Sequence, residues 1–367
     1  MALDINPQGK KMILSVDGGG IRGMIAVAML AELESVTGKT CPELFDMVAG
    51  TSTGAIIAAG IALGMSAQEL LVKVYRKRLP DAFNSQPRGL LLYARYVLGG
   101  LRNLYDLRPF VDALGEFGTG KKIRDFQKPI LFMTTKDLRT ANTYFVVSKG
   151  PGARAFADWP LVGSVGASGA APIFFPPVLG NLIDGGVGAY GNPCLAATIE
   201  ALEYIGASDG FTAGNVIHMS LGTGFAFNQL EDGAGARSWL YDWVRYLIYA
   251  GLEDAGFQQV MDTRAIYADR IDFRRYNPLL TADSVGNILG VKIAGRPDPA
   301  KLDLNSAQRD EVNLMEDIGR AYALKVNWTE VGYLPWIDGG PEKGFPRDGG
   351  HPLPGIKPID WTGTGFE

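Results

Sequence analysis

The 367-residue sequence contains few cysteines and few histidines. Its two cysteines, Cys41 and Cys194, cannot provide the disulfide framework of a small secreted protein. Neither cysteine lies in a CxxC pair or near a histidine at the spacing of zinc ligands, so the cysteines predict no metal site. We therefore expect both thiols to be buried in the core as small apolar groups. Only His218 and His351 can supply an imidazole group for acid–base chemistry.

The sequence also lacks long apolar runs and dense basic runs. No window reaches the roughly 18 consecutive apolar residues that a membrane-spanning helix needs. The N-terminal segment MALDINPQGKKMILSV carries an acid before its two lysines, and its apolar stretch is too short for a secretory signal peptide. These features predict a cytoplasmic protein whose contact with membranes is at most peripheral. Lys and Arg total 35 against 39 Asp and Glu, and the scattered basic residues argue against nucleic acid as a partner.

The composition is that of a folded protein with a large core. Hydrophobic residues make up 47% of the sequence and charged residues 20%, which excludes an extensively disordered chain. Because α/β folds often run past about 250 residues as one unit, we expect one main domain over residues 1–332. Residues 333–367 are rich in Gly and Pro and show no periodicity, which predicts a tail that runs along the surface.

Two consecutive strand–turn–helix units open the chain. An apolar run at residues 12–16 ends in the turn DGGGIRG, and residues 24–33 then favour a helix. The second unit consists of residues 45–49, the turn GTSTG and the small apolar series 55–63. Two such units in a row predict a parallel sheet in an α/β fold. Further strands are expected at residues 130–134, 143–147, around 182–183 and 216–221.

Two later segments do not follow this pattern. Residues 82–118 mix Leu, Tyr and Arg with Pro87 and several glycines, which predicts an insertion of short helices that could cover a site. Residues 236–250 place Trp239, Trp243 and Tyr246 on one helical face. Such a face suits packing in the core, which we expect, and it also suits insertion into a lipid interface.

The first glycine turn, from Asp17 to Gly23, follows a strand and opens a helix. Unpaired N–H groups and the dipole at a helix N-terminus favour a bound anion, and consecutive glycines let a ligand approach the backbone closely. Two kinds of anion fit this turn. Gly18, Gly20 and Gly23 satisfy the GxGxxG pattern that binds a dinucleotide pyrophosphate, and the same N–H groups suit the transient oxyanion of acyl transfer.

The second turn, Gly50-Thr51-Ser52-Thr53-Gly54, matches the GxSxG pattern. It lies between a predicted strand and a predicted helix, which is the context of a nucleophile elbow. An elbow lifts the serine Oγ above the sheet at a helix N-terminus, where developing negative charge is tolerated. Ser52 is therefore the candidate nucleophile, although a glycine-serine turn can also serve only to link a strand to a helix.

The third turn, Asp184-Gly185-Gly186, follows an apolar stretch, so Asp184 is expected at the end of a strand. Because the carboxyl ends of parallel strands meet at one edge of a sheet, Ser52 and Asp184 are expected to meet at that edge. On its own, a DGG sequence is also typical of an ordinary turn.

A serine nucleophile needs a base that accepts its proton, and histidine usually has that role. His218 lies in a buried-looking strand at residues 215–221, which is more typical of a core histidine, because a triad histidine normally projects from a loop. His351 lies in the Pro/Gly-rich tail, where little would hold the ring in place. An aspartate that acts directly on the serine is the remaining option.

The three turns, DGGGIRG, GTSTG and DGG, in this order and spacing, resemble those of the patatin-like phospholipases. Further similarity to that family is found at Phe45-Asp46, Ala170-Ala171-Pro172, Phe174, Phe175, Pro176 and Ser220-Leu221-Gly222-Thr223-Gly224. The resemblance spans residues 12–224, and the combination of three motifs is far more specific than any one of them. One difference is that residues 187–191 separate DGG from Asn192-Pro193, where the family often has a tighter link.

The resemblance implies a three-layer α/β/α fold with a mostly parallel central sheet. It also implies a lipid or phospholipid substrate and ester hydrolysis of the phospholipase A or esterase type, through a Ser52–Asp184 dyad and an acyl-enzyme, without a metal or cofactor. The implied oxyanion hole is the first turn, with Gly18, Gly19, Gly20, Arg22 and Gly23. Arg22 either supports the local negative charge or anchors the turn.

Two interpretations from other functional classes stay open. A dinucleotide-binding oxidoreductase would use the GxGxxG pattern, but that fold needs an acidic residue at the end of its second strand, and here residues 45–49 run directly into GTSTG. A non-enzymatic lipid-binding or interaction protein would keep the three turns as architecture. The sequence after about residue 225 matches no motif, so it carries no functional prediction.

Overall fold

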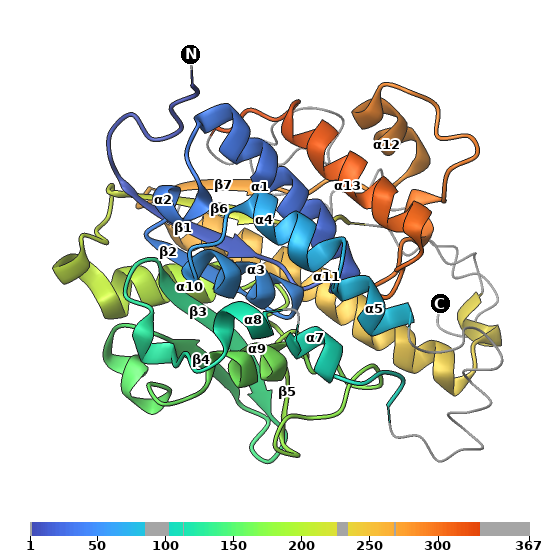
Figure 1. The fold of residues 1–367 in the computed structure, drawn as a ribbon, viewed down its shortest axis with the longest axis horizontal. Coiled ribbons are helices and arrows are strands. Elements are labelled where there is room, and N and C mark those ends of the chain that lie inside the picture. Colours follow the sequence, from blue (N-terminus) through green and yellow to red (C-terminus); the bar gives the residue numbers. More distant parts are fainter. Residues whose placement is uncertain (1, 85–102, 113, 226–233, 268, 331–367) are drawn as a thin grey trace, which may run out of the picture.

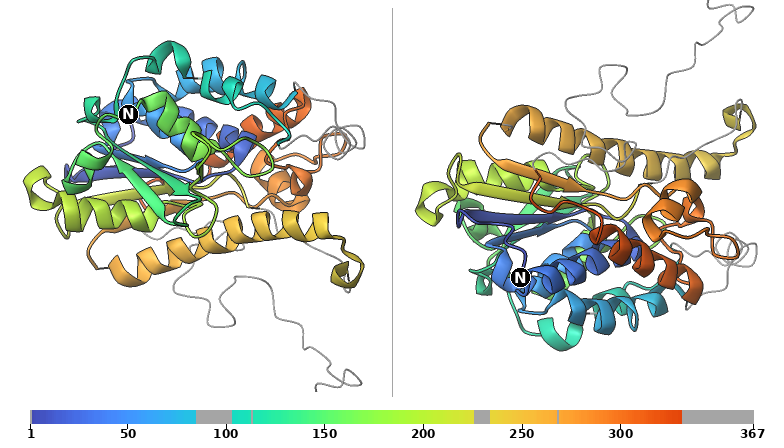
Figure 2. Two further views of the ribbon diagram at one scale, coloured as in Figure 1. Left: turned by 90° about the horizontal axis from the view of Figure 1, so that it is seen from below. Right: turned by 90° about the horizontal axis from the view of Figure 1, so that it is seen from above.

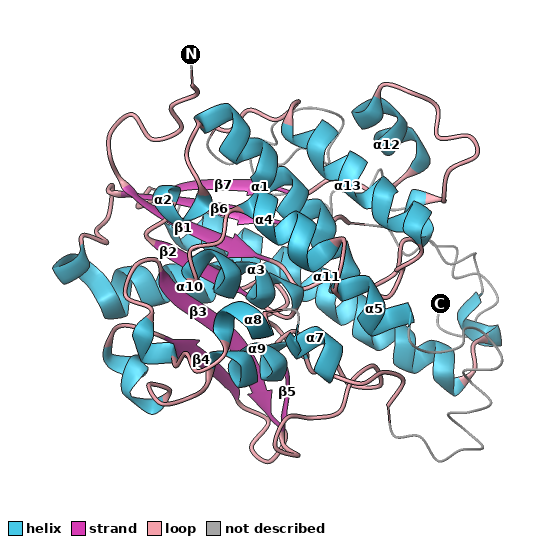
Figure 3. Ribbon diagram, in the orientation of Figure 1, coloured by secondary structure: helices cyan, strands magenta, loops and turns pink. Residues whose placement is uncertain are grey.

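A mostly parallel β-sheet forms the centre of the molecule (Figure 1). The computed structural model describes residues 2–84, 103–112, 114–225, 234–267 and 269–330. His351, the expected tail at 333–367 and the centre of the expected insertion, 85–102, therefore lie outside the described residues. Within the described ranges the sheet has seven strands, drawn in magenta in Figure 3: β1 Lys11–Val16, β2 Met47–Gly50, β3 Ile130–Asp137, β4 Thr143–Val147, β5 Leu182–Asp184, β6 Val216–Leu221 and β7 Asp272–Tyr276.

The order of the strands is β4-β3-β2-β1-β6-β7, and β5 pairs with β3 outside this path. Strands β3, β2, β1, β6 and β7 run parallel to one another, whereas β4 and β5 are antiparallel to β3. Each strand expected from the apolar runs is present within a few residues of its predicted bounds. The predicted mostly parallel sheet is thus confirmed.

Side chains of alternating strand residues enter two separate cores. On β1, Leu14 packs with Val48 in one cluster, and Ile13 packs with Met47 in the other, because successive side chains of a strand point to opposite faces. Helices cover both faces of the sheet, which confirms the three-layer α/β/α fold (Figure 2).

The helices divide between these two layers. Those that pack on the Leu14 side are α1 Gly23–Thr37, α2 Cys41–Leu44, α3 Thr53–Ala62, α4 Ala67–Leu70, α5 Leu79–Asn84, α7 Arg108–Asp112, α8 Gly115–Gly118, α9 Leu161–Gly169, α12 Ala282–Leu289 and α13 Arg309–Ala323. Those on the Ile13 side are α10 Cys194–Ile199 and α11 Leu240–Tyr267. Short 3-10 or π turns join them: η1 Gly20–Arg22, η2 Leu71–Tyr75, η3 Ile123–Asp125, η4 Pro151–Ala155, η5 Glu200–Ile205, η6 Gly206–Asp209, η7 Ala234–Arg237 and η8 Pro299–Lys301.

Strand β7 has no counterpart among the predicted strands. Its sequence, DFRRY, carries three charged residues and therefore hides the apolar alternation of a strand. Both arginines are nevertheless buried, because Arg274 pairs with Asp272 and Arg275 pairs with Asp17. Pairing and hydrogen bonding offset the cost of removing these charges from water.

Helix α11 confirms the predicted helix, but the expected core packing of its aromatic face is wrong. Trp239 is 81% exposed, Trp243 45% and Tyr246 38%. The helix is 28 residues long, and its first turns continue past the ends of the strands, where the sheet no longer covers them (Figure 2). Periodicity gives a helix an apolar face but does not show whether another layer lies against that face.

Both cysteines are buried and free, as predicted. In the described part of the chain, no helix combines the length and the apolar composition that crossing a membrane requires.

Candidate active site

Ser52 lies in a sharp turn between β2 and α3. Its backbone has φ 56° and ψ −121°, a conformation that is rare for a residue with a side chain and costs on the order of 1–3 kcal/mol. The flanking residues must be glycine, since a Cβ on Gly50 would lie 2.0 Å from the Gly54 carbonyl oxygen, and one on Gly54 would lie 2.2 Å from the Val16 carbonyl oxygen. The turn therefore has the geometry of a nucleophile elbow.

Hydrogen bonds hold this elbow from two directions. The N–H of Ser52 donates to Ser168 Oγ on α9 at 3.0 Å. Thr51 Oγ1 donates to the Tyr190 carbonyl at 2.7 Å and lies 2.7 Å from Thr134 Oγ1 on β3. Strained conformations persist only where the surrounding structure determines them, and these contacts supply that restraint.

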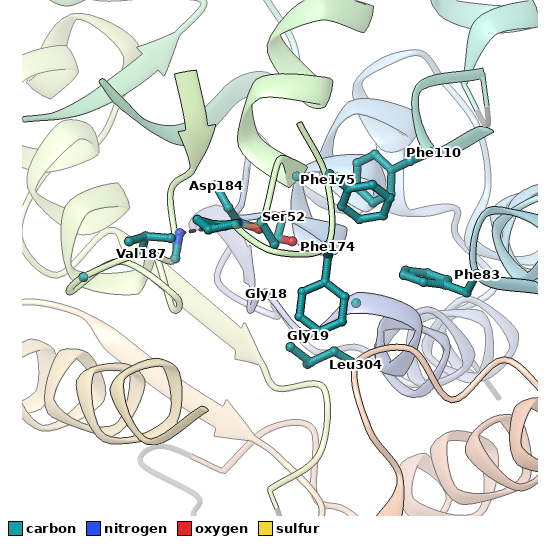
Figure 4. Close-up of a pocket in the computed structure, with 16 residues that line it drawn as sticks. Gly18, Gly19, Ser52, Phe83, Phe110, Phe174, Phe175, Asp184, Val187 and Leu304 are labelled. Carbon is teal, nitrogen blue, oxygen red and sulfur yellow. Dashed lines mark hydrogen bonds between the residues drawn. The ribbon is translucent and has the colours of Figure 1, made fainter. Parts of the chain in front are cut away.

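Asp184 lies beside Ser52 at the end of β5 (Figure 4). The prediction that Asp184 ends a strand is confirmed, but the argument from parallel strand ends is wrong, because β5 is antiparallel to β3. Asp184 pairs with Thr135 near the end of β3. The short β5 therefore reaches the carboxyl edge of the parallel strands from the opposite direction.

The surroundings of the Asp184 carboxyl favour its neutral form. It is nearly fully buried, and its Oδ1 accepts a hydrogen bond from the Gly186 N–H at 2.7 Å. Burial raises the pKa of Asp184 to about 6, while hydrogen bonding from the Ser52 side chain and from Gly186 opposes this rise. A carboxylate with this pKa is a stronger base than an ordinary aspartate and is still ionised at neutral pH.

The glycine turn lies against the elbow, since a Cβ on Gly18 would lie 3.3 Å from Ser52 Cβ. The N–H of Gly18 donates to the Gly191 carbonyl at 2.8 Å and is therefore engaged. The N–H groups of Gly19 and Gly20 have no acceptor among the described residues. Both residues line the cavity beside the serine, so backbone N–H groups without an acceptor in the described structure lie at its wall.

Arg22 and Gly23 lie behind the turn. The Arg22 N–H donates to the Gly19 carbonyl at 3.1 Å, and the Gly23 N–H donates to the Gly20 carbonyl. The Arg22 side chain is buried and interacts electrostatically with Asp17. Neither residue is among those that line the cavity in the described structure, which favours the anchoring role for Arg22 over a direct role beside the serine.

The loop between DGG and Asn192 connects all three turns. The carbonyl of Gly191 accepts from the first turn, the carbonyl of Tyr190 accepts from the second, and the loop itself follows Asp184. Asn192 Oδ1 then accepts a hydrogen bond from the Cys194 N–H at 2.9 Å, at the start of α10. The residues that distinguish this chain from the tighter family link thus contribute to the geometry of the site.

A cavity of about 330 Å³ opens beside Ser52 (Figure 4). Apart from Ser52, Asp184 and the glycines, its walls are apolar: Phe83, Phe110, Ala171, Pro172, Phe174, Phe175, Val187 and Leu304. Phe83 and Phe110 come from the described flanks of segment 82–118, so these flanks form part of the cavity wall. A volume and lining of this kind are typical of a site for an apolar ligand.

His218 is a core residue, as predicted. It lies in β6, where Nδ1 is 2.8 Å from Thr198 Oγ1 and Nε2 is 2.9 Å from Ser15 Oγ. Burial lowers the pKa of His218 to about 3, so the ring is neutral at physiological pH. Both ring nitrogens are occupied by hydroxyl groups away from the cavity lining, which leaves Asp184 as the titratable side chain beside the serine in the described structure.

Three residues of the site carry no sequence motif. Ser168 supports the elbow, Leu304 lines the cavity, and the Leu304 carbonyl accepts from the Ile21 N–H at 2.9 Å. Arg275 binds Asp17 next to the glycine turn. Each acts through a contact between distant segments, and the local pattern around these residues contains no signal for such contacts.

Comparison with known proteins places this site in a family. The family model described as patatin-like phospholipase matches residues 14–198, slightly more than half of the 367 residues. The chain is 30% identical over 175 residues to the cGAMP-activated phospholipase of Vibrio cholerae serotype O1, which covers 45% of this chain and 49% of that protein. It is 32% identical over 215 residues to the intracellular phospholipase A2 of Caenorhabditis elegans, with 55% and 18% covered.

A third relative is the cGAMP-activated phospholipase of Escherichia coli, which is 25% identical over 223 residues, with 58% of this chain and 61% of that protein covered. The alignments span less than two thirds of each of these relatives. The region that matches the family model contains the glycine turn, the elbow and the DGG turn, and the chain belongs to the patatin-like phospholipase family.

Proposed function

We propose that this chain is a lipid acyl hydrolase that cleaves carboxylic ester bonds through a Ser52–Asp184 dyad. One observation carries the proposal: a strained serine and a buried aspartate with a pKa of about 6 face each other in an apolar cavity. Perturbed pKa values and strained backbone at one cavity are typical of catalytic sites. Family membership and relatives named as phospholipases support the same class of reaction.

In the proposed first step, Asp184 accepts the Ser52 proton while Oγ attacks the ester carbonyl carbon. The resulting oxyanion receives hydrogen bonds from the N–H groups of Gly19 and Gly20. The N–H of Thr53 is a third donor, because it directly follows the nucleophile and has no acceptor among the described residues. Gly18 then supports the turn through its bond to Gly191.

Collapse of the tetrahedral intermediate breaks the ester C–O bond, and Asp184 returns its proton to the leaving alkoxide. Water, deprotonated by the same carboxylate, attacks the acyl group on Ser52 and releases the carboxylic acid. Every proton in this sequence has its donor and acceptor within the dyad, the water and the substrate.

The cavity suits the acyl part of a lipid. Phenylalanine side chains and Leu304 form its wall, and these groups exclude water and pack against methylene chains. A dinucleotide is a poor alternative ligand, because this apolar wall offers no partner for a pyrophosphate and the Gly18 N–H is already bonded. A non-enzymatic lipid-binding protein would use the same cavity but would have no need of a strained serine or of a buried carboxyl beside it.

Peripheral contact with a lipid surface is part of the proposal. The exposed Trp239, Trp243 and Tyr246 are side chains that favour a water–lipid boundary. Helix α11 begins beyond the carboxyl edge of the parallel strands, and this is the edge where β2 leads into Ser52 (Figure 1). The aromatic side chains therefore lie beyond the same edge of the sheet as the proposed nucleophile.

The test is labelling by a fluorophosphonate, followed by mass spectrometry of the adduct and assay of a soluble p-nitrophenyl ester. We expect the adduct on Ser52, and we expect Ser52→Ala and Asp184→Asn each to lower turnover by several orders of magnitude. Ser208→Ala, at an exposed serine, is the control and should match the wild type. Normal turnover and labelling in Ser52→Ala would refute the proposal, and lipid analysis of products from mixed vesicles would identify the head group and acyl chain.

A further inference from the structure

A buried arginine from β7 binds the residue that precedes the three glycines. Arg275 Nη1 lies 2.8 Å from Asp17 Oδ1, and Nη2 lies 2.5 Å from Asp17 Oδ2. We propose that Arg275 is a positioning residue that fixes the oxyanion-binding turn through Asp17. This proposal rests on the function proposed above, since it assigns Arg275 a role in the same reaction.

The glycine turn needs an anchor from outside because residues 18–20 have no side chains of their own. Glycine has more backbone freedom than any other residue, and an oxyanion hole stabilises charge only when its donors are already in place. Asp17 is the residue with a side chain that directly precedes the three glycines in the sequence. Fixing its carboxylate therefore fixes the point from which the turn starts.

Other contacts hold the turn farther along. Thr223 Oγ1 donates to the Gly18 carbonyl at 3.0 Å, and the Leu304 carbonyl accepts from the Ile21 N–H at 2.9 Å. Together with Arg275, these contacts restrain the turn at its start, at its first glycine and at its end. All three restraints come from the chain after residue 198, where the match to the family model ends.

The two hydrogen bonds from the Arg275 guanidinium suit the positioning of Asp17 better than a single point charge at the same place would. Two parallel hydrogen bonds to one carboxylate set its orientation as well as its distance, and a lysine ammonium cannot reproduce this arrangement. A further bond from Nη1 to Ser220 Oγ at 2.9 Å ties the guanidinium to β6. The carboxylate of Asp17 is thus linked to two neighbouring strands, β6 and β7.

The adjacent residue provides a matched control. Arg274 is equally buried on the same strand, and its Nη2 lies 2.5 Å from Asp272 Oδ2. Its Nη1 donates to the carbonyls of Ile5 and Trp328, which are not among the residues that line the cavity. Arg274→Lys therefore removes a buried bidentate pair without touching the glycine turn.

The experiment compares Arg275→Lys with Arg274→Lys on a soluble ester, with active sites counted by the final amount of fluorophosphonate adduct. We expect Arg275→Lys to lower kcat by about 10- to 100-fold while KM stays within about threefold, because the lost interaction acts on the transition state. Inhibition by a trifluoromethyl ketone, which forms an oxyanion on Ser52, should weaken by a similar factor, whereas binding of the corresponding alcohol should not. Arg274→Lys should keep kcat and both affinities within about twofold, even if its thermal stability falls equally.

Two further variants make the inference refutable. Asp17→Asn combined with Arg275→Lys should lower kcat no more than the larger single effect, because both changes remove one linkage. If Arg275→Lys does not fold, Ser220→Ala removes one hydrogen bond of the guanidinium and should lower kcat about threefold with KM unchanged. Equal kcat in the Arg274 and Arg275 variants, additive effects in the double variant, or an unchanged Ser220→Ala would overturn the positioning role. Absence of any adduct in the wild type would instead refute the proposed function.

Discussion

The backbone N–H of Ser52 donates a hydrogen bond to the hydroxyl of Ser168 at 3.0 Å, although 116 positions separate the two residues. The bond joins the strained elbow to α9, a helix from a different part of the chain. Ser168 therefore restrains the backbone of the proposed nucleophile from a separate helix and has no proposed role in the reaction itself.

This contact predicts the behaviour of Ser168→Ala. The change leaves the Ser52 N–H without its acceptor, which should cost about 1–3 kcal/mol of stability and lower kcat by about tenfold as the elbow relaxes. Ser164→Ala is the matched control, because Ser164 is also buried on α9 but donates only to the Pro160 carbonyl. Urea unfolding and turnover per labelled site measure the two effects. Identical kcat in the two variants would show that Ser168 does not position Ser52.

The raised pKa of Asp184 predicts how activity depends on pH. The proposed base must be ionised, so kcat/KM should be constant above about pH 7 and should fall about tenfold per unit below pH 6. The measurement uses an uncharged soluble ester, so that substrate ionisation cannot contribute. A profile that stays flat down to about pH 4 would mean that Asp184 keeps the pKa of an ordinary aspartate.

The raised pKa of Asp184 also predicts that this carboxyl destabilises the folded state at the pH where it can act as a base. The folded state holds the Asp184 proton up to a pKa of about 6, whereas the unfolded chain loses it near the ordinary aspartate pKa of 3.8. Stability from this proton is thus complete below about pH 4 and is lost as the pH rises through 6. Asp184→Asn should therefore be more stable than the wild type by about 3 kcal/mol at pH 8 and nearly equal at pH 4. Denaturant unfolding at both values tests this, and an Asn variant that is less stable at pH 8 contradicts it.

His218 distinguishes a dyad from a triad. Since its ring is bonded to Thr198 and Ser15, His218→Asn should cost about 1–3 kcal/mol of stability while turnover per active site stays within about twofold. We expect His351→Asn to leave turnover unchanged as well. Loss of labelling rate by about three orders of magnitude in a folded His218 or His351 variant would make that residue the base and would leave Asp184 an orienting role.

The exposed aromatic face predicts a split between substrates. Trp243→Ala should lower activity on lipid vesicles by about tenfold and leave activity on a soluble ester and thermal stability unchanged. The control is Trp328→Ala, because Trp328 is buried and donates to the Ala323 carbonyl, so its loss should reduce stability. Equal loss of vesicle and soluble activity in Trp243→Ala would indicate structural packing and not a lipid contact.

The sheet was largely predictable from the sequence, because short apolar runs between glycine turns report strands directly. Strand β7 escaped prediction because Arg274 and Arg275 interrupt its apolar pattern, and only the folded structure shows the carboxylates that allow them to be buried. The prediction that the aromatic face of α11 packs in the core was wrong for a different reason. Periodicity identified the face, but its exposure depends on how far the helix extends past the sheet.

In the candidate site, motifs identified the residues that would react but not those that hold them. Ser52 and Asp184 stand out because a turn surrounds each of them in sequence. The sequence indicates five residues of the first turn as the oxyanion hole. Only the structure shows that the N–H groups of Gly19 and Gly20 are free among the described residues, because the acceptor for the Gly18 N–H is a carbonyl of a distant loop. Backbone carbonyls are present at every residue, so no sequence pattern marks the one that is used.

The position of β7 late in the chain affects when the site can work during protein synthesis. The ribosome completes Ser52 and Asp184 first, and Arg275 leaves it only after the whole of α11 has been made. A nascent chain that stops before β7 carries both residues of the proposed dyad but lacks the guanidinium that binds Asp17. Since domains acquire their structure as synthesis proceeds from the N-terminus, the proposed role of Arg275 predicts that ester hydrolysis reaches its full rate only after β7, the last strand of the described residues, has paired with β6.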